Sequence, residues 1–248
     1  MNPGEAISLK AEHILEIGDF QVTNALLFSC LVAFLFLLFG FLFKKKIKLI
    51  PDRLQAIFEV LIEGITGLME SVLGSRKKAE KYLPFVASIF LFIIFSNWFG
   101  LLPGLTAIGL KEHELIIPFL RSPASDINFT LALAIVSVIS INILAVRSLG
   151  FKAHFSKFFN FQNPIKFFVG ILEFVLEGAK VLSFSFRLFG NVFGGEVLLL
   201  VIGFLVPYLV PIPFLAMEFF VGFLQAFIFA MLTLVFIAVA IEPHEEHN

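Results

Sequence analysis

A single arginine in the middle of a long apolar segment most strictly limits what this chain can fold into. Arg187 lies within Ser183-Phe184-Ser185-Phe186-Arg187-Leu188-Phe189-Gly190-Asn191, and apolar sequence extends far on both sides. A guanidinium keeps its proton in a protein, and its cost at a membrane centre runs from about 3 to more than 10 kcal/mol. A membrane sequence keeps such a cation where a carboxylate, backbone dipoles or water meets it, so Arg187 is the first candidate functional residue. The other interpretations are a structural ion pair or a side chain that reaches the membrane surface, although Arg187 is far from the ends of the apolar segment.

The composition indicates a polytopic membrane protein and excludes an ordinary soluble domain. Of the 248 residues 59% are hydrophobic and 15% are charged, and the mean hydropathy is +0.98; both point to repeated membrane spans. The one cysteine, Cys30, lies in an apolar segment, so no internal disulfide can form. Acidic residues precede the first apolar segment where a signal peptide would have basic ones, so that segment is predicted to be a retained anchor.

The pattern of apolar segments predicts an all-α polytopic membrane protein with one membrane domain over residues 1–248. Five membrane-embedded helices and one interfacial amphipathic helix are expected, because a helix of about 20 residues crosses the hydrocarbon core. The interfacial helix is predicted where apolar side chains recur at helical spacing and Glu59, Glu63 and Glu70 interrupt them. The predicted segments are an external N-terminal segment 1–21, a first span 22–43, the interfacial helix 51–73, spans 82–102 and 127–147, and a tilted hairpin of two long helices 164–241.

Basic residues beside the spans predict the orientation of the chain. They collect in the loops that follow the first span, the interfacial helix and the third span, and such loops face the cytoplasm. The N-terminus and residues 103–125 are therefore expected outside, and the C-terminal tail from Glu242 to Asn248 inside, in the cell inner (plasma) membrane rather than an organellar one. The basic residues are Lys44, Lys45, Lys46, Lys48, Arg76, Lys77, Lys78, Lys81, Arg147, Lys152, Lys157 and Lys166.

The last third of the chain is too long for upright spans. Residues 164–205 would form a helix of about 60 Å, roughly twice the hydrocarbon thickness. Such a helix must tilt steeply, break or begin along the interface, and Gly190, Gly194 and Gly195 are the candidate points for a break. A turn rich in proline near Pro207 and Pro211 leads into the second long helix.

Polar residues of the first long helix fall on one stripe. At 100° per residue, Glu173, Lys180, Ser183 and Asn191 lie within about 40° of Arg187. Glu196 falls on the opposite side if the helix stays regular. On the second long helix Glu218 and Gln225 share a face, and Glu218 lies at a depth similar to that of Glu196, outward of Arg187. Two such carboxyls would repel if both were ionised, which suits a proton relay; neutral, hydrogen-bonded packing is the alternative.

The motif around Arg187, followed by Gly195-Glu196, closely resembles the signature of subunit a of F-type ATP synthases. Leu224-Gln225-Ala226-Phe227-Ile228-Phe229 resembles that family's last helix, and Pro123-Ala124-Ser125-Asp126-Ile127-Asn128 and Phe161-Gln162-Asn163-Pro164 also resemble family segments. The resemblance implies a membrane subunit of ATP synthesis and proton (hydrogen ion) transport that is not catalytic alone. Its partners would be a ring of c subunits with membrane carboxylates and b-type peripheral stalk subunits, in the bilayer and without nucleic acid.

The resemblance also implies roles for individual residues. Arg187 would separate two offset half-channels that lead protons to and from the ring carboxylates. Asn191, Glu196 and Gln225 match family positions along the aqueous path, and Glu218 stands where many bacterial members have histidine. Gly100 stands where some relatives have aspartate near Asn97, so the outer mouth is expected to depend more on Asp126 and Glu218.

Other function classes fit the sequence less well. A secondary ion-coupled transporter or channel subunit would also have charges at the midplane, but no internal repeat is evident. The histidines lie outside the predicted spans, so no haem, other cofactor or metal is expected there; the acidic and histidine-rich tail is more simply a solvated end. A membrane scaffold would leave Arg187 unexplained. No phosphate-binding loop is present, so nucleotide chemistry would belong to partners.

Overall fold

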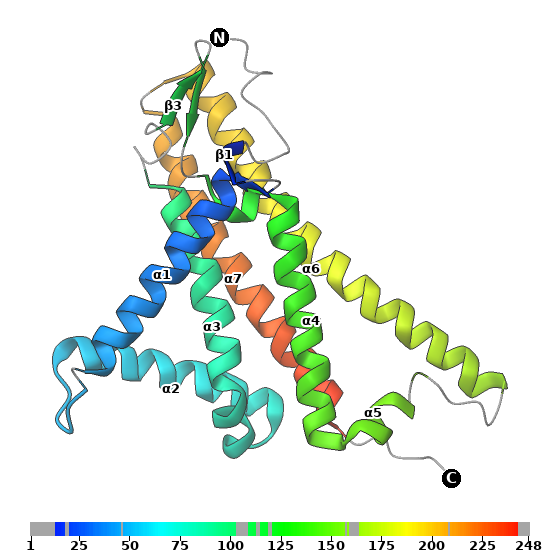
Figure 1. Cartoon of the computed structure of the whole chain (residues 1–248). Coiled ribbons are helices and arrows are strands. Elements are labelled where there is room, and N and C mark those ends of the chain that lie inside the picture. The colour runs from blue at the N-terminus through cyan, green and yellow to red at the C-terminus, as the bar shows by residue number, and fades with distance from the viewer. Residues whose placement is uncertain are drawn as a thin grey trace.

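Apolar helices long enough to cross a bilayer make up most of the computed structural model (Figure 1). The structure describes residues 13–17, 20–45, 47–102, 109–112, 115–118, 121–156, 158, 164–207 and 209–242. The helices are α1 (Asn24–Lys44), α2 (Arg53–Leu73), α3 (Arg76–Gly100), the short 3-10 helix η1 (Pro123–Ser125), α4 (Ile127–Leu149), α5 (Phe151–Ser156), α6 (Pro164–Leu205) and α7 (Pro211–Ile241).

The predicted fold class is confirmed. Within the described residues five helices have the length and hydropathy of membrane spans, namely α1, α3, α4, α6 and α7. The amphipathic helix α2 is not one of them, and it runs across the ends of α1 and α3 (Figure 1). The predicted return of the tail falls on residues 243–248, and parts of the predicted external segments fall on 1–12 and 103–108; these lie outside the described residues, as does Phe161-Gln162-Asn163.

Short strands that the hydropathy pattern did not predict lie before α1 and between α3 and η1. Two antiparallel hairpins form, one from β1 (His13–Ile17) with β2 (Phe20–Thr23) and one from β3 (Gly109–Glu112) with β4 (Leu115–Pro118). Both hairpins lie at the end of the molecule where α6 turns into α7, and α2 and α5 lie at the opposite end (Figure 1). The molecule therefore has two distinct ends, as a chain that crosses a membrane requires.

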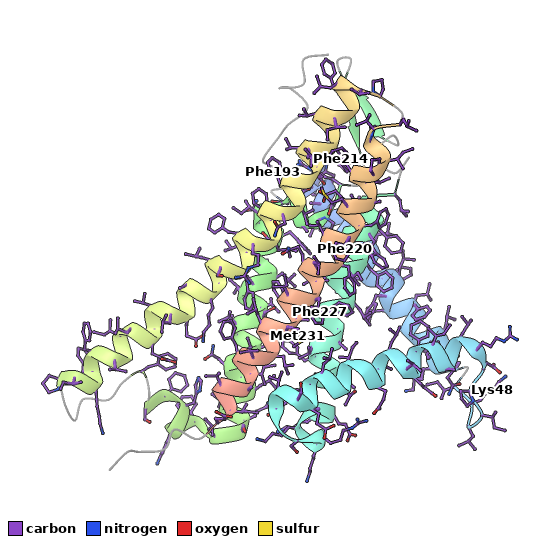
Figure 2. The ribbon with its side chains drawn as sticks, turned by 180° about the vertical axis from the view of Figure 1, so that it is seen from behind. Lys48, Phe193, Phe214, Phe220, Phe227 and Met231 are labelled. Carbon is purple, nitrogen blue, oxygen red and sulfur yellow. The ribbon has the colours of Figure 1, made fainter. Side chains whose placement is uncertain are left out.

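Helix α6 is continuous over its 42 residues. The candidate break at Gly190, Gly194 and Gly195 does not occur, because all three glycines remain helical. The halves of α6 and α7 nearest their connecting turn lie side by side, while the N-terminal half of α6 diverges from the bundle (Figures 1 and 2). That diverging half exposes a series of large apolar side chains, including Ile165, Phe168, Leu172, Phe174 and Val175, so it must meet lipid or another apolar surface.

Small and aromatic side chains fix how α6 is rotated. Phe184 and Leu188 are buried in one cluster with Ala134 of α4 and Ala226 of α7, where alanine lets helices approach closely. The rings of Phe184 and Phe229 stack with centroids 4.6 Å apart, which adds to the packing. Since this face of α6 is held inside the bundle, Phe186 on the other side of the helix is exposed.

One arginine joins the end of α2 to the start of α3. The Nη1 and Nη2 atoms of Arg76 each donate a hydrogen bond of 2.7 Å to the Glu63 carboxylate, and Nε donates to Glu80 Oε1 at 3.0 Å. The Glu70 carboxylate lies 3.8 Å from Nη1. A bidentate pair of this kind has a defined geometry that a single contact lacks, so Arg76 sets the angle at which α2 leaves α3.

The Arg76 network predicts a pH-dependent attachment of α2. Hydrogen bonds from Arg76 hold the pKa of the Glu63 carboxyl below its ordinary value of 4.5. The contribution of the Glu63–Arg76 contact to the free energy of unfolding is thus fully present above pH 4.5 and is lost as the pH falls through the lowered pKa of Glu63. Arg76→Gln should raise the amide hydrogen exchange of α2 at pH 7, and the difference from wild type should shrink towards pH 3.5.

The control for this experiment is Arg53→Gln, which removes the same charge at the exposed start of α2. This variant should exchange like wild type. Equal exchange of α2 in Arg76→Gln and wild type at pH 7 would contradict the role given to Arg76.

Candidate functional site

Arg187 lies half-buried in the middle of α6, next to the exposed Phe186 and at the edge of the buried face that holds Phe184 and Leu188. Its Nη2 donates a hydrogen bond of 3.0 Å to the hydroxyl of Ser183, one turn earlier. Its Nη1 is buried and has no hydrogen-bond partner among the residues that the structure describes. No carboxylate of the described part of the chain pairs with this cation, so its charge is uncompensated among the described residues.

The remaining residues of the predicted stripe follow Arg187 along α6. Ser183 and Asn191 are exposed, and Glu173 and Lys180 are half-buried. Lys180 Nζ lies 2.6 Å from the carboxylate of Glu177, a residue that the stripe prediction omitted because it falls about 80° from Arg187. The stripe therefore holds one paired cation, Lys180, and one unpaired cation, Arg187.

Glu196 and Glu218 meet on the opposite side of α6, because the helix stays regular through its glycines. The carboxyl of Glu218 lies directly against Gly195, where an added Cβ would collide with it. Both carboxyls line one small cavity of about 20 Å³ with Asn97, Ser122 and Gly222. Glu218 is only 6% exposed and, within the described residues, makes no hydrogen bond or ion pair, so this close approach depends on the absence of a side chain at Gly195.

Arg121 completes a cluster with Glu196 and Glu218, called the outer cluster below because it lies on the side of Arg187 nearest the turn between α6 and α7. The sequence pattern did not identify Arg121 as a member. Its Nε and Nη2 each lie 3.4 Å from Glu196 Oε2, and Nε also donates to Ser125 Oγ at 3.1 Å. Arg121 and Glu196 are 16% and 29% exposed, respectively, in their side chains. The pair is 75 residues apart, which is beyond any helical pattern. The available signal in the sequence was that Arg121 lies two residues before the Pro123–Ser125 segment of η1.

The cavity between the carboxyls has room for water and several buried polar atoms beside it. Asn97 Nδ2 donates a hydrogen bond to the carbonyl oxygen of Gly222 at 3.1 Å. Asn97 Oδ1 and Ser122 Oγ are both buried and have no hydrogen-bond partner among the described residues. A water molecule needs at least about 10–15 Å³ and two or more polar partners. Both conditions are met, so one water can connect the two carboxyls to Asn97 and Ser122.

Asp126 and Gly100 have structural roles beside this cavity. The carboxylate of Asp126 caps α4, because Oδ1 accepts hydrogen bonds from the Asn128 backbone N–H at 2.9 Å and from its side chain at 3.2 Å. Asp126 does not line the cavity. At Gly100 an added Cβ would lie 2.7 Å from Ser122 Cβ, so the ends of α3 and η1 leave no room for a larger residue there. The outer cluster is thus built around Glu196, Glu218 and Arg121 and does not include Asp126.

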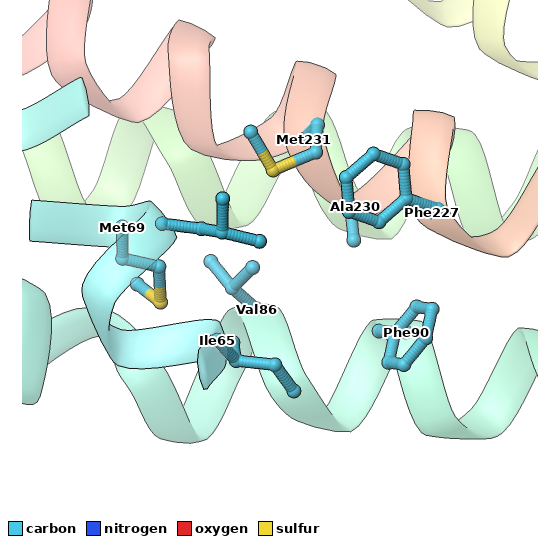
Figure 3. A pocket seen from close by; sticks show the side chains of 8 residues that line it. Ile65, Met69, Val86, Phe90, Phe227, Ala230 and Met231 are labelled. Carbon is cyan, nitrogen blue, oxygen red and sulfur yellow. The ribbon is translucent and has the colours of Figure 1, made fainter. Parts of the chain in front are cut away.

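A second cavity is larger but apolar. It has a volume of about 40 Å³ and lies where α2, α3 and α7 meet. Figure 3 shows Ile65, Met69, Val86, Phe90 and Met231 around it, all of them carbon and sulfur side chains. A proton needs groups that can accept it, so this cavity is packing space and not part of an ion path.

Gln225 is half-buried on α7, three residues after Gly222, and makes no hydrogen bond to the described residues. Its amide is available to water or to a partner.

The chain is similar to proteins of one family along most of its length. Residues 26–238 match the family described as ATP synthase A chain. ATP synthase subunit a of Campylobacter concisus (strain 13826) is 39% identical over 221 residues, which cover 87% of this chain and 89% of the relative. Subunit a of Campylobacter jejuni subsp. jejuni (serotype O:23/36, strain 81-176) is 35% identical, with 88% and 89% covered. Subunit a of Campylobacter curvus (strain 525.92) is 36% identical, with 87% and 90% covered.

Adjacent glycines of α6 give a matched test of the outer cluster. In Gly195→Ala the new methyl group must displace the buried Glu218 carboxyl, and overpacking of this kind costs about 1–3 kcal/mol. In Gly194→Ala nothing lies within 4 Å of the new methyl, and the helix gains up to about 1 kcal/mol. Thermal unfolding of the purified protein in detergent should show a lower midpoint for Gly195→Ala only. Equal midpoints for the two variants would contradict the contact between α6 and α7 at Glu218.

Proposed function

The chain belongs to the ATP synthase A chain family, and from this premise we propose that it is the stator subunit that leads protons through the membrane sector of ATP synthase. As a member of the subunit a family, it is a non-catalytic membrane subunit. Two offset half-channels, separated by Arg187, would carry protons to and from carboxylates on a ring of c subunits.

The uncompensated charge of Arg187 is the observation that carries this proposal. A guanidinium at membrane depth requires an anion or water, and no carboxylate of the described residues pairs with it. The N-terminal half of α6 beside it exposes apolar side chains such as Phe174 and Val175. A ring of helices with one membrane carboxylate each would supply both an apolar surface and the missing anion.

The outer half-channel would use the two carboxyls differently. Glu196 is held by the Arg121 guanidinium at 3.4 Å, which favours a fixed anion. Glu218 has no such partner among the described residues, so it is the carboxyl that can exchange a proton with the cavity water. A proton would pass from the outer solution to Glu218 and then along α6 towards Asn191 and the ring.

The inner half-channel would run along the stripe from Arg187 towards Ser183, Lys180 and Glu173. The end of the molecule with α2 and α5 carries Lys44, Lys45, Arg76 and Lys77, which supports a cytoplasmic position for that end. The hairpins and the outer cluster would then face outward. The membrane would be a bacterial plasma membrane, and b-type stalk subunits would hold the protein against the moving ring.

Glu218 variants test the outer half-channel. Glu218→Gln keeps the volume and cannot titrate, so ATP-driven proton pumping per assembled complex should fall at least about tenfold. Glu218→His should retain more activity, because imidazole exchanges protons near neutral pH. A purely structural role predicts the reverse order, since glutamine is the closer match in shape. Pumping is measured in membrane vesicles from pH 6 to 9.

The matched control is Glu242→Gln, an exposed carboxyl at the far end of α7, which should pump like wild type. If Glu218→Gln pumped at the wild-type rate at every pH, Glu218 would not belong to the path.

A further inference from the structure

A chain of polar contacts connects α5 to the charged stripe of α6. His154 of α5 lies with Nε2 3.0 Å from Oδ1 of Asn142 on α4. The Asn142 amide nitrogen lies 3.1 Å from Oε2 of Glu177 on α6, and Glu177 Oε1 accepts a hydrogen bond of 2.6 Å from Lys180 Nζ. None of Asn142, His154 and Glu177 belongs to the stripe predicted from the sequence or to the family signature around Arg187.

The chemistry of Asn142 fixes the direction of these hydrogen bonds. Its amide nitrogen donates both to the Val138 carbonyl oxygen at 2.9 Å and to the Glu177 carboxylate. Both of these partners can only accept, so the nitrogen must face them and Oδ1 must face His154. His154 Nε2 therefore carries a hydrogen and donates a hydrogen bond to Asn142 Oδ1. The imidazole, which is 3% exposed, holds the amide, and the amide holds the carboxylate.

The carboxylate held in this way neutralises Lys180. The side chains of Lys180 and Glu177 are 22% and 14% exposed, a setting in which an unpaired ammonium would be costly. Lys180 Nζ also lies 4.8 Å from the centroid of the Phe236 ring on α7, a favourable position for a cation. Both charges of the pair are thus held by residues from neighbouring helices.

Lys180 lies near Arg187 on α6, so neutralising its charge affects the proposed ion path. Lys180 lies seven residues before Arg187 on nearly the same face of α6, about 10 Å along the helix axis. A bare ammonium there would be a second fixed cation on the inner half-channel. At an effective dielectric constant of about 20, a unit charge about 10 Å away changes the ratio of the protonated to the deprotonated form of a titratable group by roughly tenfold.

We propose that Glu177, oriented by Asn142 and His154, is the counter-ion of Lys180 that keeps the inner half-channel free of a second uncompensated cation, so that Arg187 alone is the barrier. Glu177 is a positioning residue of the ion path in this account and is not a proton carrier, because both of its oxygens are already occupied by donors. The inference rests on the proposed function.

A double-mutant cycle in the assembled complex tests this role. Glu177→Gln leaves Lys180 without its counter-ion, so ATP-driven pumping per assembled complex should fall about tenfold. Lys180→Gln removes the excess charge, so the double variant Glu177→Gln/Lys180→Gln should pump within about twofold of Lys180→Gln alone, a strong coupling between the two positions. Lys166→Gln, which removes an exposed charge at the start of α6, is the control and should pump like wild type.

Each outcome decides the question. Glu177→Gln at the wild-type rate would overturn the proposal, and so would a double variant that pumps several-fold more slowly than Lys180→Gln alone, because Glu177 would then be needed for itself. If Glu177→Gln does not assemble, the comparison of the double variant with Lys180→Gln still decides it. Failure of the proposed function would be seen in other variants: those of Glu218 and Arg187 would pump like wild type. That result does not depend on the Glu177 variants, so the two failures can be told apart.

Discussion

The charge of Arg187 is the constraint on which the rest of the structure depends. It cannot be removed by deprotonation, and the described part of the chain offers it one serine hydroxyl and no carboxylate. The packing of α6 keeps it in that position, because Phe184 and Leu188 are buried against α4 and α7 and so fix the rotation of the helix. Arg187 is therefore a half-buried cation for which the described residues provide no anion.

Two other charged residues of α6, Glu196 and Lys180, each have a partner of opposite charge, unlike Arg187. Nine residues after Arg187 on α6, Glu196 is paired with Arg121. Seven residues before it, Lys180 is paired with Glu177. Glu196 and Lys180 lie about 13 Å and 10 Å from Arg187 along α6, so the bare guanidinium is flanked by neutralised pairs on both sides. Glu218 differs from all of these in having neither a counter-ion nor a hydrogen bond within the described residues, and the proposed proton exchange at Glu218 rests on this difference.

The parts that were predictable from the sequence are those set by local periodicity. Hydropathy is averaged over about 20 residues, so helices α1, α3, α4, α6 and α7 lie where apolar segments of the sequence predict helices. The 100° repeat of a helix placed Arg187 and Lys180 on one stripe. The possible break at Gly190 and its neighbours did not occur: a glycine inside a helix costs only about 1 kcal/mol, and all three glycines remain helical.

The parts that were not predictable depend on contacts between distant segments. Arg121 reaches Glu196 across 75 residues, and Asn142 reaches Glu177 across 35, so neither pair leaves a pattern in the sequence. The role of Gly195 appears only when α7 brings Glu218 against it. Asp126 was expected at the outer mouth from a resemblance in sequence, and its hydrogen bonds to Asn128 show that it caps α4.

The most direct measurement of the central claim is the passive proton permeability of vesicles that contain the assembled membrane sector without its nucleotide-binding subunits. A diffusion potential drives protons through wild-type, Arg187→Ala and Arg187→Lys sectors, and ATP-driven pumping is measured on the matching complete complexes. If Arg187 separates two half-channels, Arg187→Ala abolishes pumping and leaves a passive leak between them, and lysine substitutes poorly because its ammonium is compact and can lose its proton on burial. Full coupled pumping in Arg187→Ala, with permeability equal to that of wild type, would contradict the account.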